Sequence, residues 1–205
     1  MKTIFVTCGA TVPFPDLITS VLDKKFIDTA IKFGYNRLIA QIGNGYTETL
    51  LKNVSKLDTT NNYICPLTAE QLGCNEVACS FKLKANDFEF IAIAYSSKIE
   101  DIIRNHASLV ISHAGTGSIL DALKLTKRLI VCVNDKLMDN HQQQIADKFE
   151  DLGYIVACKA TSASLMRGID IIQTNTLQEF STTRNTNFEN LLIKTAYSNT
   201  TGLYK

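Results

Sequence analysis

The chain has 205 residues, of which 45% are hydrophobic, and its 21 basic and 20 acidic side chains give a formal net charge of +1. This length is enough to bury one large core and is typical of one domain, or at most two. The balanced charge provides no broad positive field, so nonspecific binding of nucleic acid or of an anionic membrane is excluded as a first function.

The ends and the cysteines indicate a cytoplasmic protein. The apolar run at the N-terminus is too short for the core of a signal peptide, and no later run approaches the roughly 18 residues of a membrane-spanning helix. Six cysteines are scattered along the chain, and none forms a C-x-x-C pair. We therefore expect reduced thiols and no structural zinc.

Short apolar runs alternate with stretches of helical periodicity from the start of the chain. The run at 3–10 predicts a strand buried on both faces. Helical spacing of apolar residues follows as far as Gly34, which predicts the end of that helix. The next predicted elements are a strand at 37–43, a helix at 47–57, a possible strand at 62–67 and a hairpin insertion within 68–87.

The alternation is clearer in the second half of the chain. The expected strands lie at 88–95, 108–115, 129–134 and 154–159, and the expected helices at 97–106, 117–125, 139–153 and 162–172. Parallel neighbouring strands need crossover connections, which these helices supply. The predicted fold class is α/β, a Rossmann-like, mostly parallel sheet over residues 1–172.

The tail at 173–205 is polar and rich in Thr and Asn. Its segment 188–197 has the pattern of a short amphipathic helix. Two interpretations stay open, because such a helix either packs on its own domain or docks on a partner protein.

The ligand site is expected where the strands end. In an open α/β sheet, ligands bind beyond the carboxyl ends of the strands, where loops and helix N-termini converge. The loops expected there span residues 8–12, 95–98, 112–118 and 134–143.

The sequence SHAGTGS, at 112–118, joins a strand to a helix and favours phosphate. Gly115 and Gly117 allow close approach of the backbone, the hydroxyls of Thr116 and Ser118 can donate, and the helix N-terminus attracts negative charge. The alternative is a glycine turn with Ser118 as the N-cap, since neither G-x-G-x-x-G nor the Walker pattern is met.

Polar side chains near the starts of two helices suit the hydroxyls of a sugar. Asp121 follows Ser118 by three residues, so it shares the ligand-facing side and can accept from a ribose diol. Asn140, Gln142 and Gln143 offer amides at the start of the next helix. The alternative is ordinary helix-start chemistry, in which Asp121 compensates the helix dipole and the amides are solvated.

The chain has three histidines, His106, His113 and His141. Each has the intrinsic pKa of a base that works near neutral pH, and a structural role is the alternative. A hydrolase is disfavoured, because GTGSI does not supply the G-x-S-x-G nucleophile elbow.

Three motifs together resemble the C-terminal, donor-binding domain of glycosyltransferase family 28. They are VISHAGTGSILDAL, K-R-LIVCVN and DNHQQQIADKFEDLGY. With FVTCGATVPFPDLI at the start, the chain is most similar to the eukaryotic members, over about residues 3–156. The resemblance implies half of a two-domain GT-B enzyme. It also implies inverting transfer of GlcNAc from UDP-GlcNAc to GlcNAc-diphospho-dolichol, the second step of lipid-linked oligosaccharide assembly for N-glycosylation.

The resemblance also assigns substrate-binding residues. Matching positions are Gly9 and Thr11 in a first phosphate loop, Tyr95 and Ser96 in the uracil loop, Gly115, Thr116 and Gly117 beside the diphosphate, Asp121 at the ribose, and Gln142 and Gln143 at the donor sugar. The chain departs from the family at three places. Asp121 replaces a Glu, Ala146 stands where the bacterial pattern has Asn, and the first loop, CGATVPF, has fewer glycines than the bacterial one.

A partner is implied as well, since the family's reaction lies between two domains. The expected partner is a membrane-anchored, acceptor-binding subunit that holds this chain at the cytosolic face of the endoplasmic reticulum as a heterodimer. The partner is expected to supply the general base, with His113 as the local catalytic candidate. No cofactor or metal is expected, because the sequence has no Asp-x-Asp motif. The alternatives are a non-catalytic nucleotide-sugar-binding regulator and an interaction protein with an empty crevice.

Overall fold

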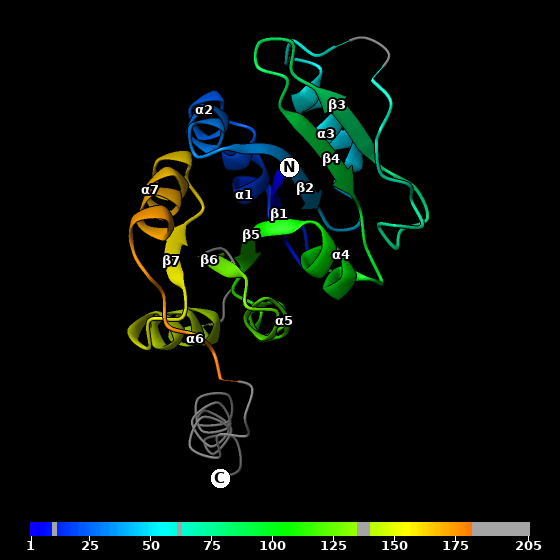
Figure 1. Cartoon of the computed structure of the whole chain (residues 1–205). Coiled ribbons are helices and arrows are strands. Elements are labelled where there is room, and N and C mark those ends of the chain that lie inside the picture. Colours follow the sequence, from blue (N-terminus) through cyan, green and yellow to red (C-terminus); the bar gives the residue numbers. More distant parts are fainter. Residues whose placement is uncertain (10–11, 61–62, 135–139, 182–205) are drawn as a thin grey trace.

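A single sheet forms the centre of the protein (Figure 1). The computed structural model describes residues 1–9, 12–60, 63–134 and 140–181, without the side chains of residues 140 and 141. Within these residues seven strands pair in the order β3-β4-β2-β1-β5-β6-β7. They are β1 (Lys2–Thr7), β2 (Tyr35–Gln41), β3 (Cys79–Lys82), β4 (Glu89–Ile93), β5 (Ala107–His113), β6 (Arg128–Val133) and β7 (Val156–Lys159).

The strand order is that of a Rossmann fold with one strand added at an edge. The pairs from β4 to β7 are all parallel, and β3 pairs with β4 antiparallel. Without β3, the strands follow the order 3-2-1-4-5-6. The predicted α/β, mostly parallel fold class is therefore confirmed.

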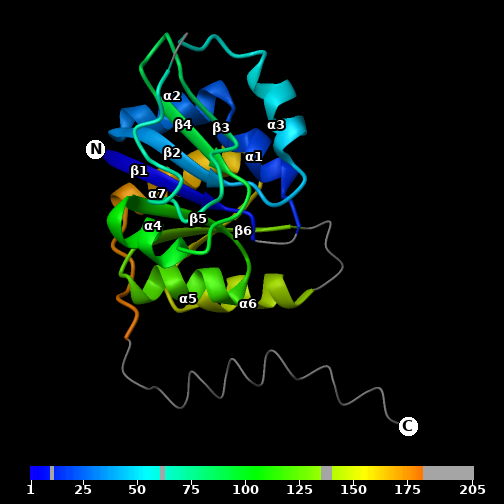
Figure 2. The same ribbon diagram turned by 90° about the vertical axis from the view of Figure 1, so that its right-hand side faces the viewer.

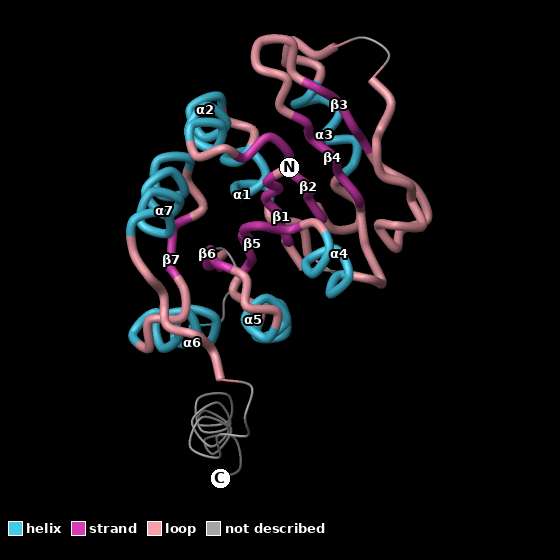
Figure 3. Tube along the Cα trace, in the orientation of Figure 1, coloured by secondary structure: helices cyan, strands magenta, loops and turns pink. Residues whose placement is uncertain are grey.

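Helices cover both faces of the sheet (Figures 2 and 3). The helices are α1 (Pro15–Val21), α2 (Lys24–Lys32), α3 (Thr47–Val54), α4 (Ile99–Asn105), α5 (Thr116–Lys124), α6 (Asn140–Asp151) and α7 (Ser162–Thr174). Side by side, α4, α5 and α6 lie against one face, whereas α1, α2 and α7 lie against the other. The chain thus crosses from β1 to β2 through α1 and α2 on one face, and from β4 to β7 through α4, α5 and α6 on the other. Both faces of the sheet are covered, as the sequence pattern predicts.

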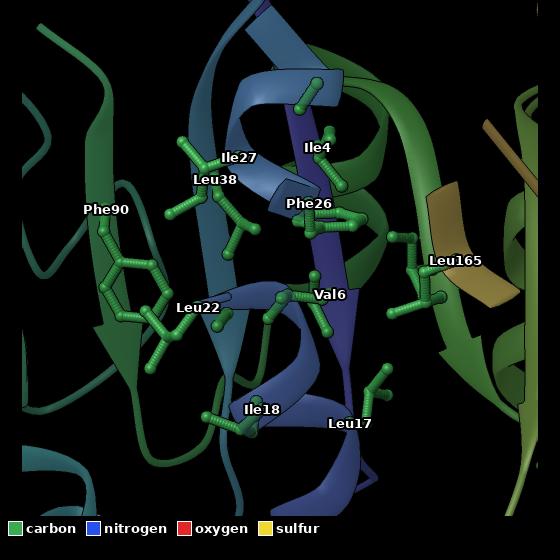
Figure 4. Packing of buried hydrophobic residues seen from close by; sticks show 14 of the residues in the cluster. Ile4, Val6, Leu17, Ile18, Leu22, Phe26, Ile27, Leu38, Phe90 and Leu165 are labelled. Carbon is green, nitrogen blue, oxygen red and sulfur yellow. The ribbon is translucent and has the colours of Figure 1, made fainter. Parts of the chain in front are cut away.

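The two layers use alternate residues of the same strands. Ile4 and Val6 of β1 pack with Phe26 and Leu165 from the α1, α2 and α7 layer (Figure 4). Phe5 points to the opposite face and belongs to the α4, α5 and α6 core. Each fully buried side chain of this size contributes about 1.5–3 kcal/mol of transfer free energy, so both faces hold the central strand in place.

The first helical stretch is divided in the structure. The sequence pattern predicts continuous helix up to Gly34, but α1 ends at Val21 and α2 begins at Lys24. Asp23 separates them, because its carboxylate accepts a hydrogen bond of 2.9 Å from the Lys25 N–H and caps α2. The stop at Gly34 is confirmed, with a φ of +83° that suits glycine.

Residues 63–87 differ from the predicted pattern in part. The possible strand at 62–67 is wrong, since the described residues 63–67 form no strand. Ile64 is 87% exposed, and Pro66 has no N–H to pair. The hairpin is confirmed for one arm, β3, while its other arm is β4 rather than a second strand inside the insertion.

The structure continues beyond the predicted boundary at residue 172. Helix α7 ends at Thr174, and the Gln178 N–H then donates to the Gly153 carbonyl at 2.9 Å. The ring of Phe180 packs edge-on against Tyr154, 5.4 Å between centroids. The segment 188–197 lies outside the described residues. Within the described part of the chain, no helix has the length and apolar composition needed to cross a membrane.

Candidate functional site

The candidate site lies beside β1, at the point in the sheet where the strand order switches direction. Strands β2 and β4 are added on one side of β1, and β5, β6 and β7 on the other. β1 pairs with β2 on one side and β5 on the other, and Thr7 stands opposite Ser112 at their carboxyl ends. The loops that follow β1 and β5 therefore meet, as the strand order of an open α/β sheet requires at its ligand-binding crevice.

The imidazole of His113 lies between the two loops. A Cβ on Gly9 would come within 3.0 Å of His113 Nε2, and a Cβ on Gly115 would overlap the same nitrogen. Gly9 also has a φ of +85°, which disfavours any other residue there. These two glycines are required by the His113 ring, whereas the sequence interpretation assigned Gly115 to close approach of a ligand.

Gly117 differs from the other two glycines. A Cβ at this position would meet no atom within 4 Å, and the residue is exposed at the second position of α5. Nothing among the described residues requires glycine there. The open space in front of the helix N-terminus is the place where a ligand can come close to the backbone.

The N-terminus of α5 has no side-chain cap. Its N-cap residue is Gly115, and Ser118 lies inside the helix at the third position. The alternative in which Ser118 caps a plain glycine turn is therefore wrong. The N–H groups of the first turn remain available to an anion, with the helix dipole favouring negative charge.

The surroundings of His113 shift the pKa of its imidazole from the ordinary value. Burial lowers the pKa of His113, and the neighbouring Thr7 backbone only partly offsets this effect. Its Nδ1 is buried and makes no hydrogen bond of regular geometry with the described residues. The imidazole is therefore neutral at neutral pH. Burial raises the pKa of the nearby Cys8 thiol to about 12, so Cys8 is not a nucleophile there.

Asp121 is half-buried on α5. Burial raises the pKa of Asp121, the Glu100 carboxylate raises it further, and Lys124 lowers it. Glu100 lies in the first turn of α4, directly after the 95–98 loop. Asp121 therefore lies on the side of α5 that faces α4, and burial and the Glu100 charge both disfavour its ionised form in the free protein.

The 95–98 loop is held by internal hydrogen bonds. The Ser96 N–H donates to Gln41 Oε1 at 3.0 Å, and the Ser96 hydroxyl donates to the Leu72 carbonyl at 2.6 Å. The same hydroxyl accepts from the Lys98 N–H at 2.9 Å. Ser96 therefore shapes the loop from inside. The Tyr95 side chain is 47% exposed beside Gly73 and Asn44, where it can contact a ligand.

The two predicted glutamines at the start of α6 differ in their bonding. Gln143 is exposed, and its amide donates to Asp147 on the same helix at 2.6 Å. Gln142 has a buried side-chain oxygen without a hydrogen-bond partner among the described residues. A buried acceptor without a partner is the expected condition for a ligand contact, so the geometry favours Gln142 over Gln143.

Two predicted site residues are not placed. Thr11 and the side chain of Asn140 lie outside the described residues. Within the described part of the chain, no group of three or more His, Cys, Asp or Glu side chains could hold a metal ion.

Sequence reasoning missed Gln41, whose side chain is fully buried at the end of β2. Its amide bonds to both the Gly9 carbonyl and the Ser96 N–H, so it links two loops of the site. The available signal was one amide inside the apolar run RLIAQIG, since a buried polar side chain needs specific partners.

Comparison with known proteins gives concordant results. The glycosyltransferase family 28 C-terminal domain matches residues 3–196. The UDP-N-acetylglucosamine transferase subunit ALG13 of Saccharomyces cerevisiae is 46% identical over 197 residues, 96% of this chain and 97% of that protein. A solution structure of ALG13 matches with a TM-score of 0.73 at 45% identity, covering 96% of this chain and 97% of that one.

A more distant structure shows the fold alone. The crystal structure of Acinetobacter baumannii MurG matches with a TM-score of 0.52 at 12% identity. The match covers 85% of this chain but 42% of the MurG chain. The fold of the present chain thus corresponds to less than half of that protein.

Proposed function

The chain belongs to the glycosyltransferase family 28 C-terminal domain family, and on this premise we propose that it is the donor-binding catalytic subunit of an N-acetylglucosaminyltransferase. The proposed reaction is inverting transfer of GlcNAc from UDP-GlcNAc to GlcNAc-diphospho-dolichol. The observation that carries the proposal is the 46% identity, along almost the whole chain, to a relative named as a UDP-N-acetylglucosamine transferase subunit.

The uncapped N-terminus of α5 is proposed to hold the diphosphate of the donor. The N–H groups of Thr116, Gly117 and Ser118 belong to the first turn, and no side chain of the described residues caps this end. The diphosphate gains negative charge as the glycosidic bond breaks, so fixed N–H dipoles stabilise the departing UDP more than the bound donor. This difference between the two states lowers the barrier to transfer.

The rest of the donor is assigned to the loops around that helix. Asp121 accepts hydrogen bonds from the ribose hydroxyls, and the loop containing Tyr95 and Ser96 holds the uracil. Gln142 is assigned to the donor sugar, because its buried side-chain oxygen has no hydrogen-bond partner among the described residues. His113 is proposed to shape the phosphate loops, since it fits between Gly9 and Gly115 and is neutral.

The acceptor is assigned to a second protein. The relative is named as a subunit, which supports a heteromeric enzyme. We assign the lipid acceptor, the general base and the membrane anchor to that partner, with this chain held peripherally at the cytosolic face of the endoplasmic reticulum. The base must lie on the acceptor side, because it takes the proton from the attacking hydroxyl.

Replacing Asp121 by asparagine is expected to weaken donor binding and to stabilise the free protein. A hydrogen bond to a charged group contributes about 1.5–3 kcal/mol, so the affinity for UDP-GlcNAc should fall roughly tenfold or more. The raised pKa of Asp121 means that its ionised form costs stability at neutral pH. This cost shrinks as the pH falls below the folded-state pKa and is gone below the unfolded-state pKa. A neutral amide removes this cost.

Calorimetric titration with UDP-GlcNAc and thermal unfolding of the free protein measure the two effects. Glu100→Gln is the matched control, because it also removes a carboxylate of this pair. The control should stabilise the free protein without the tenfold loss of affinity. Unchanged affinity of Asp121→Asn would remove Asp121 from the donor site, and absence of binding by the wild-type protein would contradict the proposed function.

A further inference from the structure

We propose that Gln41 is a positioning residue that fixes the spacing of the two donor-binding loops on either side of β2. The inference rests on the proposed function, because it concerns how the same site is held before the donor arrives. Gln41 touches no part of the proposed substrate itself. It acts through Gly9 in the loop after β1 and through Ser96 in the loop after β4.

The side chain of Gln41 bridges the two loops directly. Its Nε2 donates to the Gly9 carbonyl at 3.1 Å, and its Oε1 accepts from the Ser96 N–H at 3.0 Å. Gln41 is 0% exposed at the carboxyl end of β2, and β2 lies between β1 and β4 in the sheet. One amide therefore reaches a loop on each side of its own strand.

The chemistry of the bridge suits only an uncharged group with both a donor and an acceptor. The Gly9 partner is a carbonyl, which must receive a hydrogen, and the Ser96 partner is an N–H, which must give one. An amide meets both needs, and so does a protonated carboxyl group. An ionised carboxylate meets only the Ser96 need and places a negative charge beside the Gly9 carbonyl.

The bridge matters for binding because the two loops are assigned to different parts of one rigid ligand. The loop after β4 is proposed to hold the uracil, and the loop after β1 is assigned to the diphosphate. Gly9 has a φ of +85°, so its carbonyl takes an unusual direction, and the Gln41 amide holds it there. A site with fixed spacing loses less conformational freedom when the donor binds.

The test compares three substitutions at Gln41. Gln41→Met removes both hydrogen bonds at similar volume, and its affinity for UDP-GlcNAc should fall roughly tenfold at every pH. Gln41→Glu should show the same loss when ionised and recover to within about twofold of the wild type in mild acid, since burial raises the pKa of a carboxyl and its protonated form can restore the bridge. Gln41→Asn is too short to span both loops and should not recover.

Calorimetric titrations from about pH 8 to about pH 5.5 measure these affinities, with folding checked at each pH by circular dichroism. The adjoining titratable groups are the His113 imidazole and the Cys8 thiol, and the wild-type protein over the same range corrects for both. Gln173→Glu is the matched control. Its amide also donates a partly buried hydrogen bond, to the Tyr35 hydroxyl at 2.9 Å, and it lies far from the site. Its affinity should match the wild type throughout.

The outcomes separate this inference from the proposed function. Recovery in acid by Gln41→Glu alone supports the positioning role. Wild-type affinity of folded Gln41→Met or Gln41→Asn, or of Gln41→Glu in its ionised form, would overturn it, while leaving the proposed function intact. If Gln41→Met does not fold, Gln41→Asn decides in its place. Failure of the wild-type protein to bind UDP-GlcNAc would overturn the proposed function and this inference together.

Discussion

Gly117→Leu should bind UDP-GlcNAc roughly a hundredfold more weakly than the wild-type protein, while unfolding at the same temperature or higher. The position is open, since a Cβ there meets no atom of the described residues within 4 Å. Leucine is a much better helix former than glycine, by roughly 0.5–1 kcal/mol, so the free protein should not lose stability. The new side chain instead occupies the space in front of the α5 N–H groups.

The size of the effect follows from the hydrogen bonds that the leucine would block. Displacing the diphosphate from two N–H groups removes charge-assisted bonds worth about 1.5–3 kcal/mol each, and a hundredfold loss corresponds to about 2.8 kcal/mol. Ala163→Leu is the matched control, because Ala163 is exposed at the second position of α7. A folded Gly117→Leu that keeps wild-type affinity would show that the donor does not approach this helix end.

The second large effect is expected at Gly115, where the protein itself requires glycine. Its φ of −78° and ψ of 124° are open to any residue, so an alanine meets no backbone strain. The added Cβ would overlap the His113 ring, and overpacking of this kind costs about 2 kcal/mol. Gly115→Ala should therefore lower the free energy of unfolding by about that amount and weaken donor binding through the displaced loops.

A double-mutant cycle identifies the cause. In a His113→Ala background the obstacle is absent, so Gly115→Ala should cost almost nothing. Urea unfolding of the four proteins measures this coupling. An equal cost in both backgrounds would mean that some contact other than the His113 ring excludes a side chain at residue 115.

The fold could be predicted because local pattern and global architecture agree. Strands such as β1 and β5 are short apolar runs that glycine or a helix follows, and parallel strands buried on both faces need such runs. The division of α1 from α2 could not be seen in this way, because the spacing of apolar residues continues across the break. The capping carboxylate of Asp23 decides it.

The edge of the sheet was harder to predict for a similar reason. NYICPL has the apolar content of a strand, yet Ile64 is almost fully exposed and Pro66 cannot pair. Strand β3 is placed by its antiparallel register with β4, a tertiary feature. Local propensity does not determine which of two apolar segments joins the sheet.

That the loops after β1 and β5 converge was predictable, but the cause of each glycine was not. The glycines at 115 and 117 look alike in sequence. Only the position of the His113 ring shows that residue 115 must be glycine for packing, whereas residue 117 faces open space. Gln41 was missed because its bridge joins the loops after β1 and β4, which are 87 residues apart at Gly9 and Ser96. Knowing that β2 lies between those strands requires the sheet order.

In the function proposed here, this chain supplies the donor half of a transferase whose acceptor half is a membrane protein. The most direct measurement is transfer of labelled GlcNAc from UDP-GlcNAc to GlcNAc-diphospho-dolichol by membranes of Saccharomyces cerevisiae depleted of their own transferase subunit. The purified chain should restore transfer to these membranes, the chain alone should transfer nothing, and Gly117→Leu should restore little. A folded wild-type chain that binds UDP-GlcNAc but restores no transfer would overturn the proposed division of the enzyme.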